Sequence, residues 1–295
     1  MQNTLRSRES HAQPFRPGLD KLVLALVVLY LVVPLAATFV FGLSDGASFN
    51  LSSYGQIFSD GDFLKTLLLS LLLACLSTLL TVILITPTLY WLQLRVPQAR
   101  PLLEFLSLLP FAVPPIVLSL GYLEVFGDSH PLIDTLSLGL VPLLSNPPFN
   151  IVNTPQLLVF AYVIVALPFS YRPIDNSLRA LNTRVLAEAA ASLGSGWWRT
   201  FLTVILPNAW PGVISAALLT FSTAMGEFTI AVLSGVYTFP VYLNQTGQGN
   251  AHKAASLTIL SFIITLTCVL AIILLVQGRP SRSGRRNTIE VATGR

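Results

Sequence analysis

Six long apolar segments constrain this chain more than any other feature of its sequence. They cover residues 22–42, 66–94, 102–124, 155–171, 209–236 and 254–276. Each can cross the roughly 30 Å hydrocarbon layer of a bilayer as an α-helix, which rises about 1.5 Å per residue. Only 10% of the 295 residues are charged, whereas soluble domains carry roughly a quarter. The sequence therefore predicts an all-α integral membrane protein with six transmembrane helices.

The positive charges predict which side of the membrane each end of the chain faces. With the N-terminus placed inside, 15 of the 17 lysines and arginines fall in cytoplasmic segments, and only Lys65 and Lys253 fall outside. This asymmetry is the positive-inside pattern of membrane proteins. We therefore expect two cytoplasmic ends, a basic arm of residues 1–21 and a basic, disordered tail of residues 277–295.

The same cations account for the net charge of +4 without nucleic acid as a partner. They act as topology signals and as contacts for membrane lipid. The first apolar segment is longer than the roughly 7–15 apolar residues of a signal peptide. We therefore expect it to be retained, and residues 22–276 to form one six-span transmembrane domain.

The third apolar segment contains Pro110, Pro114 and Pro115. Because proline removes a backbone donor, this segment is expected to bend or break. Broken helix is tolerated at membrane depth only where protein or a water-filled cavity receives the freed backbone groups. We therefore expect the third span to lie against the bundle interior. In the outer loop of residues 127–154, the Leu-rich stretch 136–144 is too short to span and is a candidate re-entrant or interfacial piece.

The loop of residues 182–207, between the fourth and fifth segments, has the pattern of two short helices joined by a turn. Asn182 or Thr183 can cap the first helix, and Gly194 is placed to end it in a left-handed conformation. Its apolar positions repeat at helical spacing, at Leu186, Ala189, Ala190 and Leu193.

On the other face of this helix Arg184 and Glu188 stand four residues apart and can pair. A second short helix is expected from about Trp197, with Pro207 marking the start of the fifth span. The small residues favour a docking surface for a soluble partner. The alternative is an amphipathic loop that rests on the membrane, with its tryptophans as interfacial anchors.

The spacing in this loop resembles the EAA motif of the membrane subunits of bacterial ABC importers. That motif has Glu-Ala-Ala, three residues, Gly, nine residues, and then Ile-x-Leu-Pro. Here the matching residues are Glu188, Ala189, Ala190, Gly194, Val204, Leu206 and Pro207, with Val204 in place of the preferred Ile. The resemblance extends over about residues 64–275 and includes Leu108-Leu109-Pro110, Pro114-Pro115, Leu167-Pro168-Phe169, Pro211-Gly212 and Gly226-Glu227-Phe228.

This resemblance implies a type I importer permease fold with a cytoplasmic coupling helix, in the inner membrane of a bacterium. It implies two membrane subunits around one solute pathway, the second being a paralogue. Cytoplasmic ABC ATPase subunits would bind the loop, and a periplasmic or lipid-anchored binding protein would deliver the solute. The docking residues implied are Glu188, Ala189, Ala190, Gly194, Leu206 and Pro207.

The sequence predicts no catalytic residues, metal site or cofactor in this chain. It has no Gly-x-x-x-x-Gly-Lys-Ser/Thr loop to cradle ATP phosphates. Its three histidines (His11, His130 and His252) lie outside the apolar segments, so an intramembrane protease is not supported. An autonomous secondary transporter is a weaker alternative, because no extended internal repeat is visible.

Glu227 is the acidic residue placed deepest in an apolar segment, eighteen residues after Ala209. A carboxylate at that depth costs about 2–3 kcal/mol unless it faces water or a partner. Two interpretations stay open: a hydrogen bond between helices beside Gly226, or a place on the solute path. Gly226, Pro114 and Pro115 are the other candidates for that path.

The substrate is the least determined part of the prediction. The Gly226-Glu227-Phe228 pattern resembles permeases that handle polyamines, ferric iron, thiamine, aminophosphonates and oxyanions. Glu227 suits a cation, so we expect a solute of the spermidine/putrescine type. A molybdate- or sulfate-like oxyanion is the main alternative.

Overall fold

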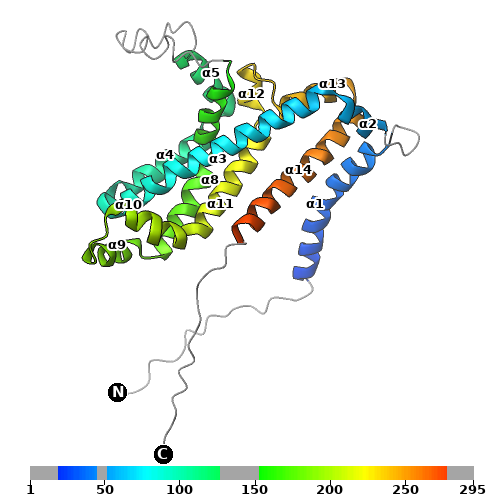
Figure 1. Cartoon of the computed structure of the whole chain (residues 1–295). Coiled ribbons are helices and arrows are strands. Elements are labelled where there is room, and N and C mark those ends of the chain that lie inside the picture. Colours follow the sequence, from blue (N-terminus) through cyan, green and yellow to red (C-terminus); the bar gives the residue numbers. More distant parts are fainter. Residues whose placement is uncertain (1–18, 45–51, 127–152, 278–295) are drawn as a thin grey trace, which may run out of the picture.

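The computed structural model describes residues 19–44, 52–126 and 153–277, and these form a helical bundle (Figure 1). The arm of residues 1–18, the loop stretch 136–144 and the tail from residue 278 lie outside the described residues. The elements are α1 (Leu19–Gly42), α2 (Ser52–Ser59), α3 (Gly61–Arg95), η1 (Pro97–Ala99), α4 (Arg100–Ala112), α5 (Pro115–Phe126), α8 (Pro155–Ala180), α9 (Thr183–Ser192), α10 (Trp197–Thr200), η2 (Phe201–Ile205), α11 (Leu206–Gly226), α12 (Thr229–Leu233), α13 (Phe239–Gly249) and α14 (Ala251–Gln277).

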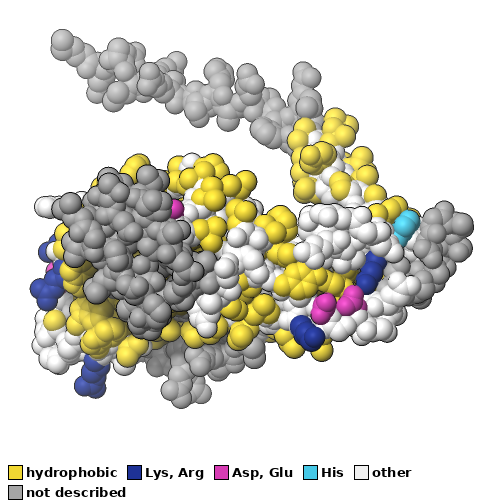
Figure 2. Space-filling view, turned by 90° about the horizontal axis from the view of Figure 1, so that it is seen from above, with side chains coloured by type: hydrophobic (Ala, Val, Ile, Leu, Met, Phe, Trp, Pro, Cys, Tyr) yellow, Lys and Arg dark blue, Asp and Glu magenta, His cyan; other side chains and the backbone are white. Residues whose placement is uncertain are grey.

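Within the described ranges, five helices are long and apolar enough to cross a membrane, and α4 with α5 makes a sixth if this bent pair is one span. The all-α prediction is confirmed, and the six-span count holds on that reading of the pair. Apolar side chains cover much of the face in Figure 2, and the charged ones gather toward its two ends. This distribution suits a protein surrounded by lipid along its middle.

The third span breaks where the sequence predicts. The axes of α4 and α5 differ by 101°, and the break falls at Pro114–Pro115, where two successive residues lack a backbone donor. The Pro114 carbonyl accepts from the backbone N–H groups of Val117 and Leu118, at 2.9 and 3.2 Å. The third span was expected to lie against the bundle interior. Only one side of α4 does so, since Phe105 and Phe111 on α4 are largely exposed.

The fourth and fifth spans differ from their predicted bounds. The fourth, α8, continues past Leu167-Pro168 to Ala180, and both Pro168 and Pro173 lie inside it. Neighbouring helices can re-satisfy the groups that proline frees within a membrane helix, and α8 packs along α3 and α11. The fifth was predicted to run to residue 236. The structure corrects this, because α11 ends at Gly226 and only the short α12 follows.

A very close contact joins α8 and α11 at Gly212. A Cβ atom at this position would lie 2.3 Å from Ser177 Cβ and 2.5 Å from the Pro173 carbonyl oxygen. The Ser177 hydroxyl donates to the Ala209 carbonyl at 3.2 Å. Any side chain larger than hydrogen would separate the two helices, so Gly212 is required for their packing.

The core lies along α3, α8 and α11. Toward the α13 end, Leu73, Leu158 and Phe221 are buried together. Toward the α9 end, the buried cluster contains Tyr90 and Ile174. We use "α9 end" and "α13 end" for the two ends of the bundle, which lie at the lower left and upper right of Figure 1.

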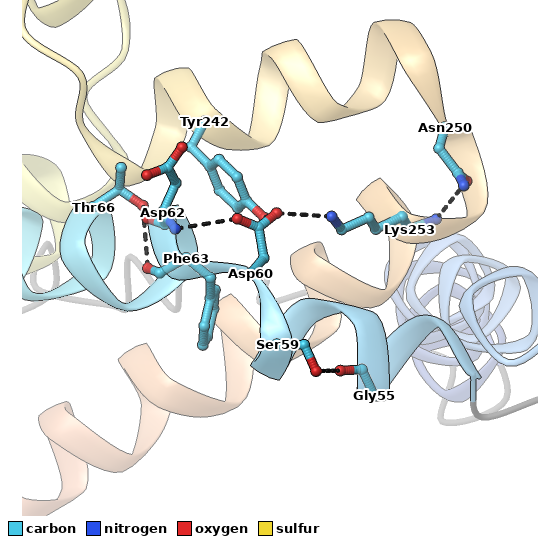
Figure 3. Close-up of polar contacts among 9 residues, drawn as sticks. All are labelled: Gly55, Ser59, Asp60, Asp62, Phe63, Thr66, Tyr242, Asn250 and Lys253. Carbon is cyan, nitrogen blue, oxygen red and sulfur yellow. Dashed lines mark hydrogen bonds and ion pairs between the residues drawn. The ribbon is translucent and has the colours of Figure 1, made fainter.

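At the α13 end, one carboxylate ties three helices together (Figure 3). Asp60 Oδ2 accepts from the Tyr242 hydroxyl at 2.8 Å and from Lys253 Nζ at 2.9 Å. Its Oδ1 accepts from the Asp62 backbone N–H at 3.1 Å and so caps α3. The hydrogen bonds from Lys253 and Tyr242 lower the pKa of Asp60 to about 2. The start of α3 is thereby fixed to α13 and to the start of α14.

We predict that Asp60→Asn destabilises the fold and removes part of its pH dependence. A charge-assisted hydrogen bond contributes about 1.5–3 kcal/mol, and partial exposure reduces this to about 1–2 kcal/mol here. Because folding lowers the pKa of Asp60, the contribution is complete above the unfolded pKa, about 3.9, and is lost as pH falls toward 2.

Thermal unfolding in detergent, followed from about pH 6 to pH 2, measures this effect. Asp62→Asn is the matched control, because Asp62 is exposed and lies 3.8 Å from Lys65. Identical pH profiles for the native chain and Asp60→Asn would contradict the prediction.

Candidate functional site

The helix α9 ends in a hydrogen-bonded turn centred on Gly194. Gly194 has φ +78, and the N–H groups of Gly194 and Ser195 donate to the carbonyls of Ala191 and Ala190, at 2.9 and 3.0 Å. This pair of bonds is a Schellman motif, which favours glycine at the left-handed position. The predicted left-handed end of the helix is confirmed.

The start of α9 differs from the prediction, because neither Asn182 nor Thr183 caps it by a side chain. Asn182 itself adopts a left-handed conformation, φ 49 and ψ 51, which asparagine tolerates better than most residues. The Thr183 hydroxyl donates back to the Leu178 carbonyl of α8. The physical reason is the short turn between α8 and α9, in which the left-handed Asn182 and the back-bonded Thr183 form the corner.

The predicted pair on α9 is present. Arg184 Nε lies 2.9 Å from Glu188 Oε1, and both side chains are well exposed. A pair of this kind contributes only about 0.3–0.5 kcal/mol. Either charge is therefore free to exchange its partner at little cost.

An apolar patch on α9 and α10 faces away from the rest of the chain. Leu193 is 89% exposed, Val185 64% and Trp198 61%, and Ala189 is exposed beside them. Of the predicted apolar face, Leu186 packs against the buried cluster at this end. Ala190 is partly buried, whereas Ala189 and Leu193 are exposed. Exposed apolar patches of this kind mark interaction sites.

The second helix of the loop is not separate from the fifth span. It begins at Trp197 as predicted, but runs through α10 and the π-helical turn η2 directly into α11, giving 30 helical residues from Trp197 to Gly226. The Leu206 N–H donates to the Phe201 carbonyl in the wide π-turn. Pro207 follows in the first turn of α11 and has no N–H to donate. The wide π-turn directly before it lets the helix continue through the proline.

An aromatic cluster fixes α10 to the bundle. Trp197 lies 5.1 Å from Tyr90 of α3 and 5.8 Å from Phe201, measured between ring centroids, and Tyr90 stacks on Phe201 at 5.3 Å. Aromatic pairs at these separations contribute beyond their buried area. These contacts join the start of α10 to α3 and to the first residue of η2.

The six predicted docking residues fall into two groups. Glu188, Ala189, Ala190 and Gly194 lie on α9 and its final turn, beside the exposed patch. Leu206 and Pro207 lie in the first turn of α11, where Leu206 packs against the buried cluster and Pro207 is exposed. The first group is placed for contact with a partner, whereas Leu206 belongs to the joint between loop and span.

Glu227 occupies the break between α11 and α12 and is half-buried. Its carboxylate accepts from the Ile230 N–H at 3.0 and 3.1 Å and from the Ala231 N–H at 3.4 Å. These unpaired amides at the start of α12 compensate the buried charge. A Cβ at Gly226 would meet no atom within 4 Å, so the close helix approach expected beside this glycine is not seen.

The candidate path residues lie on neighbouring elements. Pro115 begins α5, and α5 packs against α12, which follows Gly226 and Glu227. The α5 residue that packs against the buried cluster containing Ile230 and Ala231 of α12 is Tyr122, seven residues beyond Pro115. Among the residues that the structure describes, no cluster of His, Cys, Asp or Glu could hold a metal ion.

The sequence reasoning missed an ion pair that joins α4 to α8. Arg100 Nη2 lies 2.5 Å from Asp175 Oδ2, and Gln93 of α3 donates to Asp175 Oδ1 at 3.2 Å. The Asp175 side chain is almost completely buried. A lone acidic residue among arginines was the available signal, but the fourth span was predicted to end at residue 171, before Asp175.

No family model matches the chain, but curated proteins do. It is 31% identical over 240 residues to the spermidine/putrescine transport system permease protein PotB of Escherichia coli, covering 79% of this chain and 83% of that protein. It is 36% identical over 175 residues to the molybdenum transport system permease protein ModB of Azotobacter vinelandii, covering 58% and 73%. A probable sulfate transport system permease protein of Chlorella vulgaris is 37% identical over 126 residues, covering 42% and 44%.

The fold also resembles a solved structure. It superposes with a TM-score of 0.63 on a chain of a bacterial ABC transporter involved in the import of the acidic polysaccharide alginate. The match covers 89% of this chain and 96% of that chain, at 14% sequence identity. At this identity the likeness concerns the fold alone.

Proposed function

This chain belongs to the permease subunits of ABC importers, and from that premise we propose that a cytoplasmic ABC ATPase docks on its loop of residues 182–207. The observation that carries the proposal is the uncovered apolar patch of Val185, Leu193 and Trp198 beside the EAA-like residues. An ATPase surface that covered it would gain burial of apolar area, about 25 cal/mol per Å².

The joints of the loop support a mechanical role. Since α10 continues into α11 without a break, displacement of the docked loop moves the fifth span as a lever. Close packing at Gly212 carries the movement to α8. ATP can shift the equilibrium between the inward-facing and outward-facing states only by as much as it binds one state more tightly than the other. The continuous helix connects the docked ATPase to the solute pathway and so couples ATP binding to this equilibrium.

We predict that Gly194→Asp and Glu188→Lys each uncouple the transporter without preventing insertion. Aspartate at Gly194 is strained by the positive φ, and its charge would be desolvated in a docking cleft. Retention of the ATPase on the affinity-purified permease should fall about tenfold, with ATP hydrolysis no longer coupled to transport.

Gly194→Asn is the control, because asparagine accepts the left-handed conformation without adding charge. It should retain most of the ATPase. Full ATPase retention and full coupled hydrolysis in both charged variants would contradict docking and would favour the membrane-anchor interpretation of the loop.

For the substrate, we propose a polyamine-type cation. Support comes from the relative whose name specifies spermidine/putrescine transport, which matches over most of both chains. The relatives named for molybdenum and sulfate support an oxyanion as the second candidate. Ferric iron, thiamine and aminophosphonate have no supporting relative among those compared above. A thermal-shift screen of the cognate solute-binding protein separates these classes.

We propose that Glu227 borders the solute path together with Gly226, Pro114 and Pro115. Support comes from the packing of α5, which begins after one helix break, on α12, which begins after the other. Breaks of this kind are where membrane transporters expose backbone and side-chain groups to solute.

We predict that Glu227→Gln reduces uptake of a cationic solute several-fold while complex assembly survives. Glutamine keeps an oxygen acceptor for the Ile230 N–H and removes the charge. Glu227→Leu is the comparison, since it also removes the cap, at a cost of about 0.5–2 kcal/mol, and should impair assembly. Uptake into proteoliposomes measures both variants, and normal uptake with Gln would exclude Glu227 from the path.

We propose that the chain works beside a second permease subunit, a paralogue, and receives solute from a periplasmic or lipid-anchored binding protein. The exposure of helix α1 supports the presence of a partner subunit or lipid beside it, because none of its most apolar 18-residue stretch is buried within the chain. The positive-inside pattern supports placing the α9 end and both termini in the cytoplasm.

We predict that single cysteines at Ser281 and Gln98 are shielded from a membrane-impermeant thiol reagent in intact cells, and that Asn50 and Ser145 are labelled. Gln98 lies in η1; the other three positions lie outside the described residues. Cys75 and Cys268 are first replaced by alanine. External labelling at Ser281 would overturn the proposed orientation.

A further inference from the structure

A charged pocket of about 470 Å³ opens between the start of α4 and the last turns of α8. It lies at the α9 end of the bundle, and no step of the proposed function uses it. The side chains that determine its chemistry are Arg100, Glu104, Tyr171, Arg172, Asp175 and Arg179.

The charges of this pocket leave an excess of positive charge. Arg100 is neutralised by Asp175, at 2.5 Å. Arg172 and Arg179 are exposed and form no ion pair within the described part of the chain. Glu104 offsets one of these two charges, so the pocket retains a net charge of about +1 with two guanidinium groups available.

The floor of the same pocket is polar and already paired within the chain. Arg100 interacts there with the Tyr171 hydroxyl as well as with Asp175, and Tyr171 is 3% exposed. Arg100 Nε and the Tyr171 hydroxyl have almost no accessible surface. The donors that a bound molecule can reach are therefore the exposed guanidinium groups of Arg172 and Arg179.

We propose that this pocket binds one phosphate-type oxyanion. Arg172 and Arg179 would donate to it from the rim, over the polar floor that Arg100, Asp175 and Tyr171 form. Guanidinium forks match the geometry of phosphate oxygens. The oxyanion belongs either to the headgroup of an anionic phospholipid or to a free phosphate.

The surroundings favour the lipid as its source. On α4, immediately after Arg100, Leu102 is 60% exposed and Phe105 62% exposed. An acyl chain can lie along these side chains while the headgroup enters the pocket. Basic pockets between membrane helices are known to hold anionic headgroups in this way.

The site also lies next to the docking loop. A second pocket shares Arg100 and Arg179 and extends to the start of α9, at Asn182 and Thr183. An anion bound to Arg179 would stabilise the corner from which α9 projects. This consequence rests on the proposed function, whereas binding of the anion does not, since it is measured on the chain alone.

The test compares two double variants of the purified full-length chain. Arg172→Gln with Arg179→Gln removes the two rim charges. Arg95→Gln with Arg199→Gln removes the same charge from exposed positions at the same end, outside the pocket. Native mass spectrometry measures binding of phosphatidylglycerol and of phosphatidylcholine to each protein in detergent.

We expect the pocket variant to bind phosphatidylglycerol about tenfold or more weakly than the native chain, while the control variant and the binding of phosphatidylcholine stay unchanged. Equal loss in the two double variants would show general surface attraction and would overturn the proposal.

The single variants Arg172→Gln and Arg179→Gln are the second measurement, and circular dichroism confirms that the helix content is kept. The proposal requires weaker phosphatidylglycerol binding in each, and unchanged binding in both would overturn it. Competition by inorganic phosphate identifies a free-anion site, and its failure identifies the lipid headgroup as the ligand.

Discussion

The contact between α8 and α11 at Gly212 is the interaction on which the rest of the arrangement depends. With no hydrophobic driving force between helices in lipid, close packing and hydrogen bonds hold spans together. The absence of a side chain at Gly212 lets α11 approach the backbone of α8 at Pro173. These two helices then provide the surface on which α3 packs and the two ends from which the loop of residues 182–207 projects. A larger residue at Gly212 would displace both helices and the loop of residues 182–207 between them.

The satisfaction of backbone groups explains the shapes of the remaining spans. A helix break leaves amides and carbonyls without partners, and this cost is large in hydrocarbon. At the break after α11 the Glu227 carboxylate accepts from the amides of α12. At the break between α4 and α5 two prolines remove the donors themselves, and the Pro114 carbonyl accepts from the next turn. Each break therefore has partners or prolines that account for its free backbone groups.

The α9 end shows how a solvent-facing loop can be both exposed and mechanically firm. Its outer surface carries Leu193 and Trp198, which are largely exposed, although the ring of Trp198 also lies 6.0 Å from that of Phe201. Its inner surface is held by the stack of Trp197, Tyr90 and Phe201, and by the buried pair of Arg100 and Asp175. The exposed side can bind and release a partner because the inner side keeps the loop folded without that partner. This division suits a surface that receives movement from one subunit and delivers it to another.

The sequence alone determined the features that follow from local rules. Hydropathy identified the membrane helices, the double proline identified the break after Val113, and Gly194 identified the left-handed end of α9, because each depends only on neighbouring residues. The spacing of Glu188, Gly194 and Pro207 also indicated the permease family, which the relatives then established.

Only the tertiary structure decided the features that depend on contacts between distant segments. The helix α8 continues past Pro168 because it packs on α3 and α11, whereas the sequence alone predicted that the helix would end near this proline. The amides of α12 determined what Glu227 binds, and the π-turn before Pro207 joined the loop to the fifth span. The pairing of Arg100 with Asp175 spans 75 residues, so no local pattern could reveal it. These outcomes share one physical reason: they are set by which backbone and side-chain groups the folded bundle brings within hydrogen-bonding distance.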